Sequence, residues 1–257
     1  MFQANSTGEI PTQDDTIGKS THSSNSTDNQ SEVTTVTTIQ TTDVPTSATV
    51  ENPVPESTPV DEDYLQTCLF IGDSISTGYS GYFLLDAKNV LAKNGLHPGK
   101  LDTTTIEYNG QEVLAIDGVV QSGLKNIYIM LGSNGLGWAT TEDMVDGYRN
   151  FIQQIQEKVQ DANIYIISVP PVTSKKEDTN EYPTVEDGLV LNSTIDELNV
   201  EYLKLANEMN VHYLDINSYL KDDTGKLPYD SSTDGMHFDL DTYNKVLEYV
   251  RSHVANN

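Results

Sequence analysis

The chain has 257 residues, a net charge of −25 and a single cysteine. A surface this acidic repels phosphate backbones and anionic lipid, which argues against nucleic acid or membrane insertion. One cysteine excludes an intrachain disulfide and a thiolate metal cluster, and Cys68 lies in an apolar run where a buried, structural thiol is expected.

Residues 1–60 differ in composition from the rest of the chain. They hold 22 serines or threonines and one aromatic residue, and their apolar residues follow neither a helical nor a strand period. Such a segment buries too little surface to offset its ordering entropy. We therefore predict a disordered Ser/Thr-rich tail or linker over 1–60 and one domain over 61–257.

The tail also suggests a location for the protein. The N-terminus does not resemble a signal peptide, and no apolar run reaches the roughly 18 residues of a membrane span. Long Ser/Thr-rich stalks nevertheless often precede exported domains. We expect an extracellular or cell-surface protein that this linker can tether, with its leader outside the present sequence.

Within the domain, short apolar runs alternate with segments of helical period. A strand is predicted at 67–71 (TCLFI), with a helix after it through SGYFLLDA, and a second strand at 89–94 (NVLAKN). Asn-Gly between two alternating segments predicts a hairpin over 104–114. NIYIML (126–131) and NIYIISV (163–169) are typical of strands buried on both faces.

The remaining elements complete the alternation. A helix is predicted over 140–159, with Thr140 and Asp143 as a capping pair and one apolar face formed by Met144, Tyr148, Phe151, Ile152 and Ile155. A polar insertion at 170–188 precedes a helix over 189–209, a fifth strand at 211–216 and a last helix over 239–254. This order predicts an α/β domain whose parallel sheet is flanked by helices.

Candidate reactive residues follow the predicted strands. Ser74 comes after the first strand, Asn134 after the third, and Asp234 and His237 after the fifth. Ligands of parallel α/β sheets bind beyond the carboxyl ends of the strands. Acyl transfer by a serine needs a base, a carboxylate that holds the base, and donors for the oxyanion, and these four side chains supply those types.

Two other site chemistries find less support. The nucleophile elbow G-x-S-x-G is absent, because Gly72-Asp73-Ser74-Ile75-Ser76 ends in serine. No His/Asp/Glu cluster has the spacing of metal ligands, so neither a metal nor a cofactor is predicted.

The motifs FIGDSISTG, LGSN and DGMH resemble those of the SGNH, or GDSL-type, esterases and lipases, over about residues 66–254. The resemblance implies a three-layer, flavodoxin-like α/β/α sandwich with a mostly parallel five-stranded sheet. By position, it implies Ser74 as nucleophile, His237 as base, Asp234 as its carboxylate partner and Asn134 as a side-chain oxyanion donor.

Other positions match the family pattern less directly. Gly95, after the second predicted strand, lies where the family has its backbone oxyanion donor, although a chain-reversal glycine is the alternative. Ile75 stands where the motif has Leu, and Gly135 stands where many members carry an acid, which leaves the support of the oxyanion loop open.

Substrate binding is assigned to Asp73 and Trp138. For Trp138, a place in the core at the start of the next helix is an equal alternative.

The expected activity is that of a serine esterase acting on a short-acyl, most simply acetyl, ester of a carbohydrate or cell-wall glycan. A lysophospholipase or thioesterase of the same family is one alternative. A non-catalytic glycan-binding or adhesion module is another, although such a module has no need of all four side chains.

Overall fold

The computed structural model describes residues 50–174 and 190–255. Its main sheet has five strands in the order β2-β1-β5-β6-β7, and all four pairings are parallel. The strands are β1 (Cys68–Gly72), β2 (Val90–Ala92), β5 (Asn126–Met130), β6 (Asn163–Ile167) and β7 (His212–Leu214). The predicted five-stranded α/β/α fold is confirmed.

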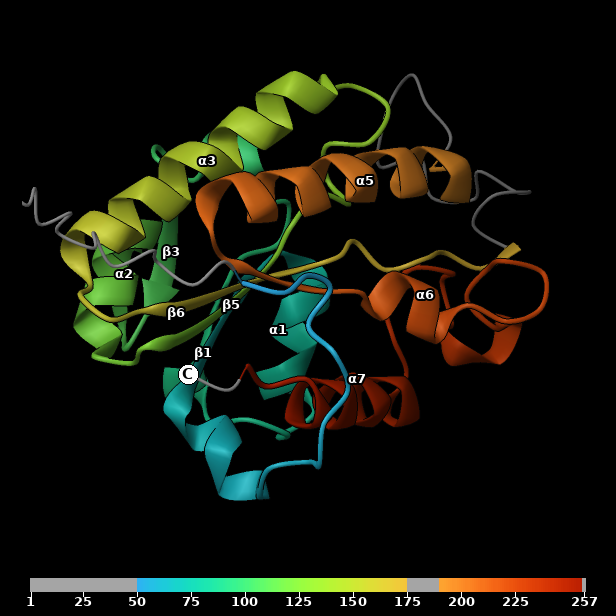
Figure 1. Cartoon of the computed structure of the whole chain (residues 1–257), viewed down its shortest axis with the longest axis horizontal. Helices are drawn as coiled ribbons and strands as arrows, with labels where there is room; N and C mark the ends of the chain where they lie inside the picture. The colour runs from blue at the N-terminus through green and yellow to red at the C-terminus, as the bar shows by residue number, and fades with distance from the viewer. Residues whose placement is uncertain (1–49, 175–189, 256–257) are drawn as a thin grey trace, which may run out of the picture. The chain divides into compact units, whose positions relative to one another are not determined.

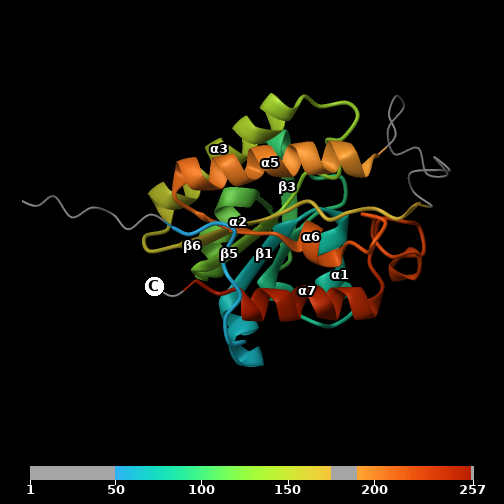
Figure 2. The same ribbon diagram turned by 45° about the vertical axis from the view of Figure 1, so that its right-hand side comes forward.

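Helices cover both faces of this sheet. One face carries α2 (Ala115–Ser122), α3 (Thr141–Lys158) and α5 (Asn192–Met209), and the other carries α1 (Ser74–Gly81), α6 (Ile216–Leu220) and α7 (Leu240–Ser252). Figures 1 and 2 show α3 and α5 above the strands and α7 below them. The described residues also form four short 3-10 helices, which are η1 (Glu62–Thr67), η2 (Ala87–Asn89), η3 (Pro98–Lys100) and η4 (Tyr229–Ser231).

The two helical layers explain why the central strands are apolar throughout. Alternate residues of a strand point to opposite faces, so Ile127 and Ile129 enter the core under α2, α3 and α5, whereas Tyr128 and Met130 enter the core over α1 and α7. A sheet covered on only one side would show polar alternation instead.

The first predicted helix and the second predicted strand are longer than the observed elements. The first helix ends at Gly81 rather than continuing through SGYFLLDA, because Phe83 adopts a left-handed conformation with φ of 58°. The second strand covers only Val90–Ala92. The hairpin forms as predicted, between β3 (Thr105–Tyr108) and β4 (Gln111–Leu114), and both Asn109 and Gly110 have positive φ.

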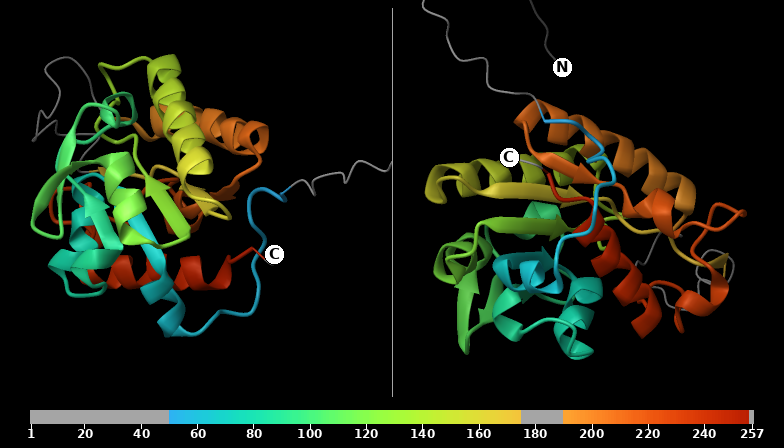
Figure 3. Two further views of the ribbon diagram at one scale, coloured as in Figure 1. Left: turned by 90° about the vertical axis from the view of Figure 1, so that its left-hand side faces the viewer. Right: turned by 60° about the horizontal axis from the view of Figure 1, so that its bottom comes forward.

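Residues 50–60 are attached to the domain, so the boundary lies earlier than the predicted Val60. Val54 is buried and its N–H donates to the Tyr213 carbonyl, while the N–H groups of Ser57 and Val60 donate to carbonyls of Ser252 and Arg251. Figure 3 shows this segment running past the end of α7. Residues 1–49 of the predicted tail lie outside the described residues, as do residues 175–189, which hold most of the predicted polar insertion.

Across the two described ranges, no helix is both long enough and apolar enough to cross a bilayer.

Candidate active site

Ser74 is the first residue of α1. It follows Asp73, which comes directly after the end of β1. Gly72, the last residue of β1, has no room for a side chain. A Cβ at Gly72 would lie 2.7 Å from the Met130 carbonyl oxygen of the neighbouring strand. Ser76 Oγ of α1 is closer still, at 2.0 Å from that Cβ, so the glycine is needed for the first turn of α1 to pack on the end of β1, which leaves Ser74 at the carboxyl edge of the sheet.

Ser74, His237 and Asp234 form one hydrogen-bonded line, although 163 residues separate the serine from the histidine. His237 Nε2 lies 2.8 Å from Ser74 Oγ, and His237 Nδ1 lies 2.5 Å from Asp234 Oδ2. A carboxylate accepts but cannot donate, so Nδ1 carries the proton and Nε2 is left to accept from the serine hydroxyl. In this arrangement the imidazole is oriented to remove a proton from Ser74.

The carboxylate of Asp234 is fixed by its own loop. Its Oδ1 accepts from the backbone N–H groups of Met236 and His237, each at 2.9 Å, and from Ser232 Oγ at 3.1 Å. Partial burial raises the pKa of Asp234, but the hydrogen bond from His237 and those from the two N–H groups outweigh it. The pKa lies well below its ordinary value, and the group stays ionised beside the imidazole.

Asn134 reaches the same site from the loop after β5. Its Nδ2 donates to Asp73 Oδ2 at 2.9 Å and to the Leu96 carbonyl at 3.3 Å. Asp73 in turn caps α1, because its Oδ1 accepts from the Ile75 N–H at 3.0 Å. One carboxylate therefore fixes both the start of the serine helix and the direction of the Asn134 amide.

This geometry does not fit the predicted substrate contact of Asp73. Its side chain is only 2% exposed and both oxygens accept from protein donors. Burial raises the pKa of Asp73 to about 6, although the Ile75 N–H, the nearby His237 and the Asn134 amide all favour the charged form. Asp73 is better described as a support for Asn134 than as a substrate ligand.

The two glycines that the motifs left open have separate explanations. Gly135 has little room for a side chain, because a Cβ there would fall 2.1 Å from Met144 Sδ in α3. In this chain the Asn134 amide is held by Asp73. Gly95 is exposed with φ of +77°, in the turn closed by the Leu96 N–H to the Lys93 carbonyl. It adjoins Leu96, the partner of Asn134, and its donor role stays a prediction.

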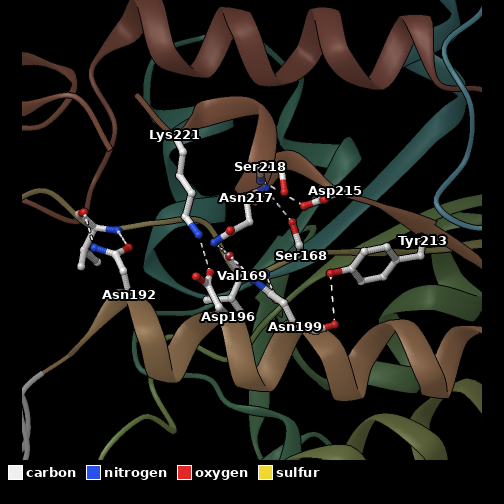
Figure 4. A network of polar contacts seen from close by, with 11 residues as sticks. Ser168, Val169, Asn192, Asp196, Asn199, Tyr213, Asp215, Asn217, Ser218 and Lys221 are labelled. Carbon is white, nitrogen blue, oxygen red and sulfur yellow. Dashed lines mark hydrogen bonds and ion pairs between the residues drawn. The ribbon is translucent and has the colours of Figure 1, made fainter. Parts of the chain in front are cut away.

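A buried asparagine network holds the loop that leads from β6 toward His237 (Figure 4). Asn199 in α5 pairs with both the N–H and the carbonyl of Val169, and Asn192 pairs in the same way with Val172. The next residue, Thr173, donates its N–H to the Gly235 carbonyl, between Asp234 and His237. The sequence interpretation missed this support, although asparagines seven residues apart on the apolar face of a helix were a visible signal.

Trp138 is 52% exposed, so the core-packing alternative is wrong. Its indole makes an edge contact with His97, with ring centroids 4.6 Å apart, and both rings line a cavity of about 380 Å³ beside α3. A separate cavity of about 460 Å³, lined in part by Leu65, Leu247 and Arg251, contains none of the predicted site residues.

Comparison with known proteins identifies the family. The model of the GDSL-like lipase/acylhydrolase family matches residues 70–245, which include Ser74, Asn134, Asp234 and His237. The chain belongs to the GDSL-like lipase/acylhydrolase family. This match confirms the resemblance inferred from the three motifs. Membership of the family identifies the protein as a hydrolase. No curated protein matches the chain.

Solved structures of low identity share the fold. A proposed platelet activating factor from Streptococcus pneumonia is 21% identical, with 72% of this chain and 81% of that chain covered and a TM-score of 0.56. A GDSL-like lipase from Bacteroides thetaiotaomicron is 13% identical, with 75% and 88% covered and a TM-score of 0.52. A proposed acylhydrolase from Bacteroides fragilis is also 13% identical, with 77% and 88% covered and a TM-score of 0.53.

Proposed function

We propose that this acylhydrolase is a serine esterase that hydrolyses carboxylic esters through an acyl-enzyme, with a short acyl group, most simply acetyl, on a carbohydrate. The observation that carries the proposal is the continuous line of hydrogen bonds from Ser74 through His237 to Asp234. A serine so placed has the base and the oriented carboxylate that nucleophilic catalysis requires.

In the proposed reaction, His237 Nε2 takes the proton of Ser74 as Oγ bonds to the ester carbonyl carbon. The bond from that carbon to the alcohol oxygen then breaks, and the alcohol leaves with the proton from His237. Water, deprotonated by the same imidazole, attacks the acyl carbon and releases the acid, and Ser74 recovers its proton.

The oxyanion of each tetrahedral intermediate would accept from the Ser74 and Gly95 backbone N–H groups and from Asn134 Nδ2. The Asn134 hydrogen directed at the Leu96 carbonyl is the one available for this task, because at 3.3 Å it makes the longer of the two contacts. The bond to Asp73 would keep the amide oriented while the other hydrogen turns to the oxyanion.

Support for a carbohydrate ester comes from the openness of the site. The side chain of His237 is 42% exposed, and Asp234 is also in contact with solvent. An exposed base suits an ester that projects from a bulky, hydrophilic alcohol portion.

The test is hydrolysis of p-nitrophenyl acetate, butyrate and octanoate by the wild type and by Ser74→Ala. Activity highest on acetate and lost in the variant is the expected result. A preference for octanoate would favour the lipase or lysophospholipase alternative, and full activity of Ser74→Ala would remove Ser74 as the nucleophile.

A further inference from the structure

The cavity beside Trp138 contains a buried histidine that the catalytic arrangement does not use. His97 is only 7% exposed, and among the described residues neither of its ring nitrogens has a hydrogen-bond partner. Leaving a buried polar group unpaired costs about 1–3 kcal/mol. Both nitrogens are covered in this structure, so a ligand in the cavity that donates and accepts hydrogen bonds would satisfy the ring once the imidazole turns toward the cavity.

The other walls of the cavity indicate the ligand's chemistry. Trp138 offers a half-exposed indole, and Asn150 and Asp146 of α3 offer polar groups in the same lining. The lining contains one cation, Lys100, and three carboxylates, from Asp102, Asp143 and Asp146. This excess of negative charge disfavours an anionic ligand.

An uncharged sugar ring has the matching properties. Its C–H face can lie against an aromatic ring, and each hydroxyl is both a donor and an acceptor. Burial lowers the pKa of His97, and the nearby Lys100 lowers it further, so the imidazole is neutral and offers one donor and one acceptor. The volume of about 380 Å³ falls within the roughly 300–1,000 Å³ of small-molecule sites.

Two residues that line the cavity are close in the chain to residues of the candidate active site. Trp138 follows Asn134 by four residues in the same loop. His97 follows Leu96, whose carbonyl accepts from Asn134 Nδ2. The loops that carry Leu96 and Asn134 therefore each contribute an aromatic ring to the lining of the cavity.

We infer that the cavity lined by His97 and Trp138 is a subsite for a neutral pyranose unit of the polysaccharide that carries the ester. The inference rests on the proposed function for the identity of the ester, but binding of the sugar can be measured without turnover. Trp138 stacks on the ring, and His97 with the polar groups of α3 binds its hydroxyls.

The chain offers a direct reporter, because Trp138 is its only tryptophan. The Ser74→Ala variant is titrated with xylohexaose, chitohexaose and hexagalacturonic acid while tryptophan emission is followed. A saturable change with a neutral oligosaccharide and none with the anionic one is expected, and His97→Leu should weaken binding about 3- to 10-fold. No change with any of the three, or tighter binding of the anionic one, would overturn the inference.

Kinetics give an independent test on p-nitrophenyl acetate and on acetylated xylo-oligosaccharide. Trp138→Ala should lower kcat/KM about tenfold on the oligosaccharide only. Tyr219→Ala, which removes another half-exposed ring lining a different cavity, is the matched control and should change neither. An equal effect of Trp138→Ala on both substrates would contradict a sugar subsite.

The two proposals can fail separately. If the wild type hydrolyses no ester but the fluorescence titration saturates, the esterase proposal fails and the sugar site stands. If p-nitrophenyl acetate is hydrolysed through Ser74 and no oligosaccharide changes the emission, the subsite inference fails alone.

Discussion

Replacement of Asp73 by asparagine should separate the stability of this protein from its catalysis. The carboxylate is buried, and its pKa is raised from the ordinary 3.8 to about 6. Because the folded pKa lies above the unfolded one, the group's contribution to the free energy of unfolding is full below about pH 4 and is lost as the pH rises through about 6. At 1.36 kcal/mol per pKa unit, that loss is about 3 kcal/mol.

Asp73→Asn cannot ionise, so it should escape this loss. Its single amide oxygen cannot serve both Ile75 and Asn134, and the lost bond lowers stability by about 1 kcal/mol at every pH. The free energy of unfolding of the variant minus that of the wild type should therefore rise by about 3 kcal/mol from pH 4 to pH 7.5. Urea unfolding at these two pH values measures the difference.

Catalysis should change in the opposite direction. With its support gone, Asn134 is no longer held toward the oxyanion, and kcat on p-nitrophenyl acetate should fall about 10- to 100-fold, less than the roughly 10²–10³ for loss of the donor itself. Asp86→Asn, a surface change beside Lys88, is the control and should leave kcat unchanged. A pH-independent stability difference, or an unaltered kcat in Asp73→Asn, would refute this description of Asp73.

Three further predictions follow from the same geometry. Asn134→Ala should lower kcat about 10²- to 10³-fold with little change in KM, because the donor acts on the developing oxyanion; an equal rise in KM would show ground-state binding instead. Asn192→Leu should lower kcat more than Ser193→Ala, a change at an exposed neighbouring position. The leucine cannot hold the Val172 backbone, which precedes the hydrogen bond from the Thr173 N–H to the Gly235 carbonyl, and equal kcat values in the two variants would show that Asn192 does not help to position the His237 loop. The pKa of Asp234 is depressed, so its contribution to the free energy of unfolding is present above its ordinary pKa of 3.8 and is lost as the pH falls further. Asp234→Asn should therefore lack this loss of stability when it is unfolded by acid. The same dependence of stability on pH in the variant and the wild type would contradict the depressed pKa.

The sheet and the approach of Ser74 to His237 could be predicted because they depend on strong local signals. NIYIML and NIYIISV are apolar on both faces, which requires helices on both sides of the sheet. The rule that sites form beyond the carboxyl ends of parallel strands then brings Ser74 together with His237.

Other features depend on contacts between distant segments and could not be read from the pattern. Residues 50–60 look like linker by composition, yet Val54 is buried in the core on the α7 side of the sheet and its N–H donates to the Tyr213 carbonyl. Asp73 is next to the predicted nucleophile in the chain, and only the packing of the loop after β5 shows that its carboxylate faces Asn134 rather than solvent. The position of His97 against Trp138 depends equally on two loops 41 residues apart.

The central claim is that Ser74 is an activated nucleophile, and covalent labelling tests it most directly. The wild type, Ser74→Ala and His237→Ala are treated with a fluorophosphonate and analysed by intact mass and peptide mapping. We predict a single adduct on Ser74 in the wild type, none in Ser74→Ala and much slower labelling in His237→Ala. No adduct in the wild type, or equal labelling of Ser74→Ala, would contradict the claim.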